Sequence, residues 1–155
     1  MSYQLRGLEP ALFEEYFSLD DGAFAARGMR WMRADAPVGY PCRISLEDAP
    51  VGEPVLLLPF THLDSRSPYR ASGPIFVRRG RSEAARIVGE LPPYLTRRPL
   101  SVRAYDAADD MIDADIVDGR EAAPLIERYL ALKDASYLHI HFARRGCFAC
   151  RVDRA

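Results

Sequence analysis

The sequence predicts an α+β fold: one domain, residues 1–155, built on a single, strongly curved, mainly antiparallel sheet of about seven strands with three or four short helices. Two observations support this prediction. Prolines and glycines divide the chain into many short segments, which is typical of strands joined by turns. The few helical patterns do not alternate regularly with the strand patterns, as they would in a parallel α/β fold.

Seven segments have the residue patterns of strands. Residues 42–46 alternate apolar and polar side chains, which is typical of a strand with one buried face. Residues 55–60 form a continuous apolar run, as in a strand covered on both faces, although Pro59 favours an edge or a strand end there. Residues 29–33, which are not counted among the seven, are ambiguous between a strand and a loop. The other five predicted strands span residues 74–79, 100–105, 111–117, 137–142 and 147–152.

Three segments have helical patterns. In residues 10–17, Pro10 suits the first turn and the apolar side chains that follow share one face. Ser82 can cap a second helix that runs to about Glu90, where two prolines end it. The third helix, residues 124–132, has leucine and tyrosine side chains on an inward face and charged side chains on the other.

Charge and composition exclude several classes of function. The formal net charge is -1 and the isoelectric point about 6.3, so there is no general positive field for nucleic acid or an anionic membrane surface. The longest apolar run, residues 55–60, is far too short to cross a bilayer, and the amino terminus lacks the pattern of a secretory signal. An odd number of cysteines, three, favours a reducing, cytoplasmic location.

The carboxy-terminal hairpin holds the densest group of chemically active side chains. In a strand over residues 137–142, His139 and His141 share one face, about 6 to 7 Å apart at their Cα atoms. A three-residue loop with Gly146 in the left-handed conformation places Cys147 on that face and turns Cys150 into the core. A two-residue loop places Cys150 with the histidines instead. The position of the glycine favours the first register, but the alternation alone leaves both open.

A metal site is one interpretation of these residues. His62, His139, His141 and Cys147 have the ligand chemistry of a zinc or iron site, with the two strand histidines at its centre. The alternatives are a polar pocket without metal, or imidazoles that only form hydrogen bonds. No P-loop, dinucleotide fingerprint, nucleophile elbow or H-E-x-x-H motif occurs in the sequence, so it leaves open whether the protein is an enzyme.

The long loop of residues 62–74 is the second concentration of polar side chains. Tyr69, Arg70 and Ser72, together with nearby backbone amides, can bind a carboxylate or a phosphate. The alternative is a compact loop whose arginine and serine side chains only satisfy its own carbonyls.

Four ordered motifs carry a resemblance to a known family. They are residues 40–49 (YPCRISLEDA), 67–78 (SPYRASGPIFVR), 100–107 (LSVRAYDA) and 139–149 (HIHFARRGCFA). Together they resemble a bacterial family known as domain of unknown function 1203. The resemblance implies a single-domain bacterial protein of about this length and brings no activity with it. It also implies that the family's motifs include Tyr69, Arg70, His139, His141 and Cys147.

Two functions of different classes follow from these observations. In the first, the protein binds a small molecule or an anion, or is an enzyme acting on one. Its pocket then joins the loop residues Tyr69, Arg70 and Ser72 to the hairpin residues His139, His141 and Cys147. In the second, the protein is a non-catalytic interaction or structural module whose motifs only stabilise loops, and a homodimer interface covers its apolar strands.

Overall fold

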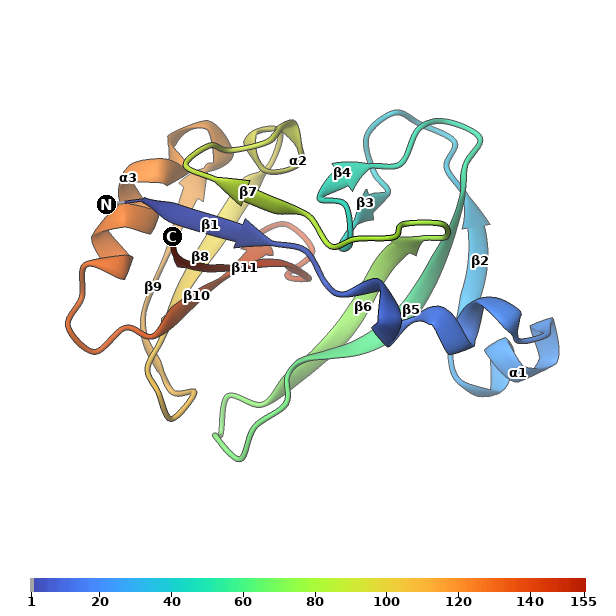
Figure 1. Ribbon diagram of the computed structural model, residues 1–155, viewed down its shortest axis with the longest axis horizontal. Helices are drawn as coiled ribbons and strands as arrows, with labels where there is room; N and C mark the ends of the chain where they lie inside the picture. Colours follow the sequence, from blue (N-terminus) through green and yellow to red (C-terminus); the bar gives the residue numbers. More distant parts are fainter. Residues whose placement is uncertain (1) are drawn as a thin grey trace.

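The computed structural model describes residues 2–155, which form two mainly antiparallel β-sheets and several short helices (Figure 1). The first sheet has six strands in the order β7-β1-β11-β10-β8-β9. Its strands are β1 (Tyr3–Arg6), β7 (Arg86–Val88), β8 (Pro99–Tyr105), β9 (Met111–Asp118), β10 (Tyr137–Phe142) and β11 (Phe148–Arg154). In Figure 1 this sheet lies on the left, and both chain ends lie on its outer side.

The second sheet has five strands in the order β2-β5-β6-β3-β4. Its strands are β2 (Arg30–Arg33), β3 (Pro41–Cys42), β4 (Glu47–Asp48), β5 (Pro54–Leu63) and β6 (Ala71–Arg78). The helices are α1 (Asp21–Ala26), α2 (Pro93–Thr96) and α3 (Ala122–Leu130), with 3-10 turns at η1 (Pro10–Leu12), η2 (Glu14–Ser18) and η3 (Gly119–Glu121). None of the helices described in residues 2–155 combines the length and the hydropathy of a membrane span.

The prediction of one strongly curved sheet of seven strands is wrong, whereas the α+β class and the mainly antiparallel pairing are confirmed. The chain leaves the first sheet after β1, builds the whole second sheet, and returns at β7 to pair with β1. Alternation along a strand shows which side chains share a face, but it does not show which strand is the neighbour. Six predicted strands were therefore located correctly and assigned to the wrong number of sheets.

Three of the predicted elements differ from the structure. The helix predicted from Ser82 is absent from the described residues, because residues 86–88 pair with β1 and this tertiary pairing outweighs the helical pattern. The helix predicted over residues 10–17 is two short 3-10 turns, η1 and η2. The strand predicted over residues 42–46 is interrupted, since the chain turns back at Leu46, whose φ of 53° is left-handed. Helix α3 confirms the third helical pattern.

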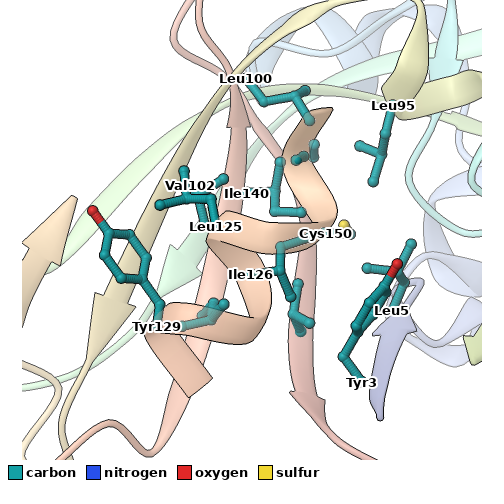
Figure 2. Close-up of a cluster of buried hydrophobic side chains, with 14 of the residues drawn as sticks. Tyr3, Leu5, Leu95, Leu100, Val102, Leu125, Ile126, Tyr129, Ile140 and Cys150 are labelled. Atoms are coloured by element: carbon teal, nitrogen blue, oxygen red, sulfur yellow. The ribbon is translucent and has the colours of Figure 1, made fainter. Parts of the chain in front are cut away.

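The main hydrophobic core lies between the first sheet and helix α3 (Figure 2). Figure 2 shows Leu125 and Ile126 of the helix next to Val102 and Ile140 of the sheet, with the Cys150 thiol beside them. Each large apolar side chain that is fully buried in this way contributes about 1.5 to 3 kcal/mol. The apolar face of β10 is therefore held against the helix, and its histidine face is turned to the opposite side of the sheet.

A second core cluster belongs to the other sheet, where Leu56, Leu58, Ile75 and Val77 pack under α1 and the 3-10 turns. The two sheets meet at several points. Near the tips of their hairpins, the Ser67 hydroxyl donates a hydrogen bond of 2.7 Å to the Asp110 carboxylate.

Gly7 lies where the chain passes from the first sheet to the second. Its N–H donates to the Ala85 carbonyl at 2.9 Å, and a Cβ at this position would lie 2.1 Å from the Ile44 carbonyl oxygen. The Cβ would meet a backbone atom and has no rotamer of its own, so a rotamer change cannot relieve the contact.

Gly7→Ala is therefore expected to lower the free energy of unfolding by about 2 to 3 kcal/mol, because the two sheets must separate locally to admit the methyl group. Urea denaturation measures the effect. Gly73→Ala is the matched control, since no heavy atom lies within 4 Å of a Cβ there and the backbone is not left-handed. Equal denaturation midpoints for Gly7→Ala and the wild type would show that the junction is not tightly packed.

Candidate functional site

All three histidines of the sequence meet in one cluster between the two sheets. His139 and His141 project from β10, and His62 projects from β5 of the second sheet. The ring centroid of His62 lies 4.9 Å from that of His141 and 6.0 Å from that of His139, and the two β10 rings are 6.4 Å apart. Residues 77 positions apart in the chain are thus brought into contact by the packing of β5 against the histidine face of β10.

The cluster is closed to solvent on the side of β10. His139 is 3% exposed and His141 is 1% exposed, whereas His62 is half-buried. The predicted alternation of β10 is confirmed, but both of its faces are buried, because the second sheet covers the side that the histidines occupy. Figure 1 shows the tip of the β5–β6 hairpin beside the β8–β9 turn of the first sheet.

Two of the buried ring nitrogens have no hydrogen-bond partner within the described residues: Nδ1 of His139 and Nε2 of His141. His141 Nδ1 lies 2.9 Å from the Gly146 carbonyl oxygen. A carbonyl only accepts, so we assign the proton to Nδ1, and Nε2 then carries a lone pair that points to no donor. A buried polar group without a partner costs about 1 to 3 kcal/mol.

Burial keeps the imidazoles neutral. Burial, followed by the neighbouring histidines and the positive charges of Arg151 and Arg103, lowers the pKa of His139 to about 2. Burial is also the main reason why the pKa of His141 is lowered to about 3, and the bond to Gly146 opposes this effect. The pKa of His62 is lowered by burial and then by Arg103. At neutral pH all three rings are therefore uncharged acceptors or donors of hydrogen bonds.

Aromatic rings form the walls of the cluster. Phe148 stacks flat on His62, with centroids 5.3 Å apart and 7° between the planes, and its edge meets His139 at 5.0 Å. On the other side Tyr105 and Tyr137 each lie 5.2 Å from the His139 ring. These contacts hold the imidazoles in fixed orientations and exclude water from them.

Two arginines flank His139 along a row that crosses three strands. Antiparallel pairing places Arg103 of β8 and Arg151 of β11 directly opposite His139, so all three side chains emerge on the same face. Arg151 is neutralised by Asp153, to which it donates at 2.8 and 2.9 Å, and its guanidinium stacks 4.2 Å over Tyr137.

Arg103 is different, because it forms no ion pair with a carboxylate of residues 2–155. Its Nε donates to the Ser101 hydroxyl at 3.1 Å, and Ser101 is the partner of His141 in the pairing of β8 with β10. Ser101, Arg103, His139 and His141 therefore form a compact polar patch on one sheet face, with one uncompensated positive charge.

The hairpin register agrees with the first alternative at Cys150 and departs from it nearer the turn. Cys150 lies opposite Ile140, fully buried in the main core, where burial raises the pKa of its thiol to about 12. Strict alternation from Cys150 would also turn Phe148 into this core, but Phe148 instead lies opposite His141. The physical reason is a β-bulge at Ala149, which adds one residue to β11 and reverses the alternation beyond it.

The structure does not reproduce the predicted metal set. Cys147 packs against the main core cluster, and its carbonyl closes a four-residue turn by accepting from Phe142 N–H at 2.9 Å. Gly146 has the expected left-handed φ of 79°. Among residues 2–155 no three histidine, cysteine or acidic side chains lie together as ligands of one ion would. The zinc or iron site on His62, His139, His141 and Cys147 therefore stays a prediction.

The loop residues predicted to share the pocket have different surroundings in the structure. Arg70 pairs with Asp64 at 3.2 Å on the exposed tip of the β5–β6 hairpin. Ser72 lines a cleft of about 480 Å³ beside β2, β5 and β6, whose walls contain no histidine. Tyr69 lies close enough to Tyr105, which forms part of the cluster wall, to act on its hydroxyl. Burial raises the pKa of Tyr105, and the Tyr69 hydroxyl adds to this effect.

Arg103 and Phe148 were not predicted as site residues. The alternation of residues 100–105 places Arg103 on the outward face of its strand, but only the pairing of β8 with β10 sets it beside His139. Phe148 reaches the cluster through a bulge, for which the sequence holds no clear signal.

Fold and site together define an α+β protein of two sheets with a buried, neutral histidine cluster where the sheets meet. A family model described as a protein of unknown function (DUF1203) matches residues 39–154, and the chain belongs to this family. The matched range includes all three histidines and Arg103. Comparisons with curated proteins and with solved structures found no match.

Proposed function

We propose that the protein binds a small polar molecule at the histidine cluster. The supporting observation is the pair of buried ring nitrogens without partners, His139 Nδ1 and His141 Nε2. Native proteins leave few buried polar groups unsatisfied, and those that remain are often functional. A ligand that donates hydrogen bonds to these nitrogens removes the cost of leaving them unpaired.

The proposal retains His139 and His141 from the sequence-based hypothesis and adds His62, Phe148 and Arg103. Arg70 and Ser72 are left out, because Arg70 is paired with Asp64 and Ser72 lines the neighbouring cleft. A homodimer and a catalytic activity both stay predictions that no observation of the structure tests.

Access to the cluster depends on the β5–β6 hairpin, since His62 of β5 covers the two buried rings. Near its tip the hairpin is held by the Ser67–Asp110 hydrogen bond and by packing of Leu63 against Tyr105 and Tyr137. Local opening of a hairpin tip costs less free energy than unfolding of the whole domain. A ligand enters when the tip lifts from the β8–β9 turn.

Nuclear magnetic resonance of histidine labelled with ¹⁵N tests the proposal, because ring nitrogen shifts report hydrogen bonding directly. The probes are lactate, glycerol, ethanolamine and inorganic phosphate, each titrated to saturation or to millimolar concentration. We expect at least one probe to shift the signals of His139 and His141 in a saturable manner. His139→Phe and His141→Phe each remove one of these imidazoles and keep an aromatic ring. Each variant is expected to lose the probe-induced shift at the ring that it removes.

Tyr40→Phe is the control, because it changes a ring hydroxyl that bonds to Asp35 outside the cluster. Near-ultraviolet circular dichroism checks that each variant is folded, and His62→Phe serves as a third variant at the half-buried position. If none of the four probes moves either ring signal, the proposal is wrong. Stoichiometric binding of added Zn²⁺ that is lost in the histidine variants would also overturn it, in favour of a metal site.

A further inference from the structure

The polar patch that contains two of the histidines indicates the chemistry of the ligand. Its members are Ser101 and Arg103 on β8 and His139 and His141 on β10, placed directly across from one another in the sheet. The patch combines one positive charge without an acidic partner and ring nitrogens without hydrogen-bond partners. These are two separate requirements, and one ligand can satisfy both.

Arg103 sets the first requirement. A guanidinium binds a carboxylate through two parallel hydrogen bonds, and Nε of Arg103 already donates to Ser101, which orients the group on the sheet face. Other arginines near the cluster have partners: Arg151 is paired with Asp153, and Arg43 donates to two backbone carbonyls. The anionic group of a ligand is therefore directed to Arg103.

His141 sets the second requirement. Because its Nδ1–H is used by the Gly146 carbonyl, the free Nε2 accepts a hydrogen bond and does not bind an anion. The donor can be a hydroxyl or an ammonium group. The positive charges of Arg103, Arg151 and Arg43 all act on the buried histidines and oppose protonation there, and they oppose an ammonium group for the same reason. A neutral hydroxyl fits this environment.

We infer that the ligand is a small hydroxy acid, whose carboxylate binds Arg103 and Ser101 and whose hydroxyl donates to a histidine ring nitrogen. This inference rests on the proposed function and narrows it to one class of molecule. Adjacent pairing positions on neighbouring strands lie about 5 Å apart, which matches the span of a short hydroxy acid. A site that hydrogen-bonds a hydroxyl discriminates strongly against the analogue that lacks it, because its own polar group is then left unpaired.

Three matched probes test the inference by calorimetry and by the ¹⁵N signals of the histidines. Glycolate has both groups, acetate lacks the hydroxyl, and ethylene glycol lacks the carboxylate. We expect glycolate to bind at least about tenfold more tightly than either of the others. Arg103→Gln is expected to reduce glycolate affinity by about tenfold or more and to leave the ring signals of the free protein close to those of the wild type.

Arg30→Gln, at an exposed position of β2, is the control and is expected to bind glycolate as the wild type does. Equal affinities for glycolate and acetate, or unchanged glycolate affinity in Arg103→Gln, would overturn the inference. If ethylene glycol shifts the histidine signals without dependence on Arg103, the hydroxy acid is wrong while the proposed function stands. If no probe of either experiment shifts the histidine ring signals, the inference and the proposed function are both wrong.

Discussion

Lowering the pH from 7.5 to 5.5 is expected to reduce the free energy of unfolding by about 3 kcal/mol. The cause is the pair of buried imidazoles, His139 and His141. Their pKa values are lowered to about 2 and about 3 in the folded protein, from an ordinary value of 6.5. Between the folded and unfolded pKa values, the unfolded chain takes up protons that the folded chain cannot. The free energy of unfolding therefore falls as the pH drops below 6.5, and the full contribution of these groups is present above that value.

The size of the effect follows from this difference in proton binding between the unfolded and the folded chain. Each imidazole that is protonated only after unfolding costs about 1.4 kcal/mol for each pH unit below its unfolded pKa. Two such groups one unit below that value give the predicted loss. This is a large part of the 5 to 15 kcal/mol by which domains are ordinarily stable. His62 adds a smaller effect of the same sign, because its pKa is also lowered and it is only half-buried.

Urea denaturation at closely spaced pH values measures this dependence. The sequence has only these three histidines, and carboxylates in general titrate mainly below the chosen range, so the slope reports the cluster. His139→Phe and His141→Phe are each expected to remove about half of it. A stability that stays constant from pH 7.5 to 5.5 would show that the rings are protonated in the folded protein and that the cluster is open to water.

Arg43→Met is expected to lower the free energy of unfolding by about 4 kcal/mol. Arg43 is 1% exposed and lies between β3 and β4 of the second sheet. Its Nε donates to the Phe148 carbonyl at 2.8 Å, and its Nη1 donates to the Pro41 carbonyl at 2.7 Å. Methionine fills part of the space and leaves both buried carbonyls without this donor, at a cost of about 1.5 to 3 kcal/mol each for bonds to a charged group.

The same substitution is expected to disturb the site, because Phe148 holds His62 by stacking on its ring. Urea denaturation measures the stability, and broadening of the His62 ring signals measures the disturbance. Arg145→Met, in the exposed hairpin turn, is the control for loss of one arginine. Arg43→Lys keeps the charge but not the planar fork, and it is expected to recover little of the loss. Wild-type stability in Arg43→Met would mean that the sheets are joined mainly by apolar contacts.

The candidate site shows which features can be predicted from the alternation of side chains along single strands. The alternation of residues 137–142 correctly predicted that His139 and His141 share a face and that Ile140 enters the core. It did not indicate that the histidine face is buried as well, since the covering strand, β5, is distant in the sequence. Arg103 and Phe148 joined the site through strand pairing and a bulge, which are properties of two segments rather than one.

Side-chain periodicity along short segments was enough to predict the α+β class, most of the strand positions, helix α3 and the pair of histidines on β10. It could not predict that there are two sheets, that β7 forms in place of a helix, or that all three histidines meet between the sheets. Pairing between distant segments depends on packing across the whole domain. The same packing removes water from the imidazoles, and their neutral state is therefore a property of the fold rather than of the motif.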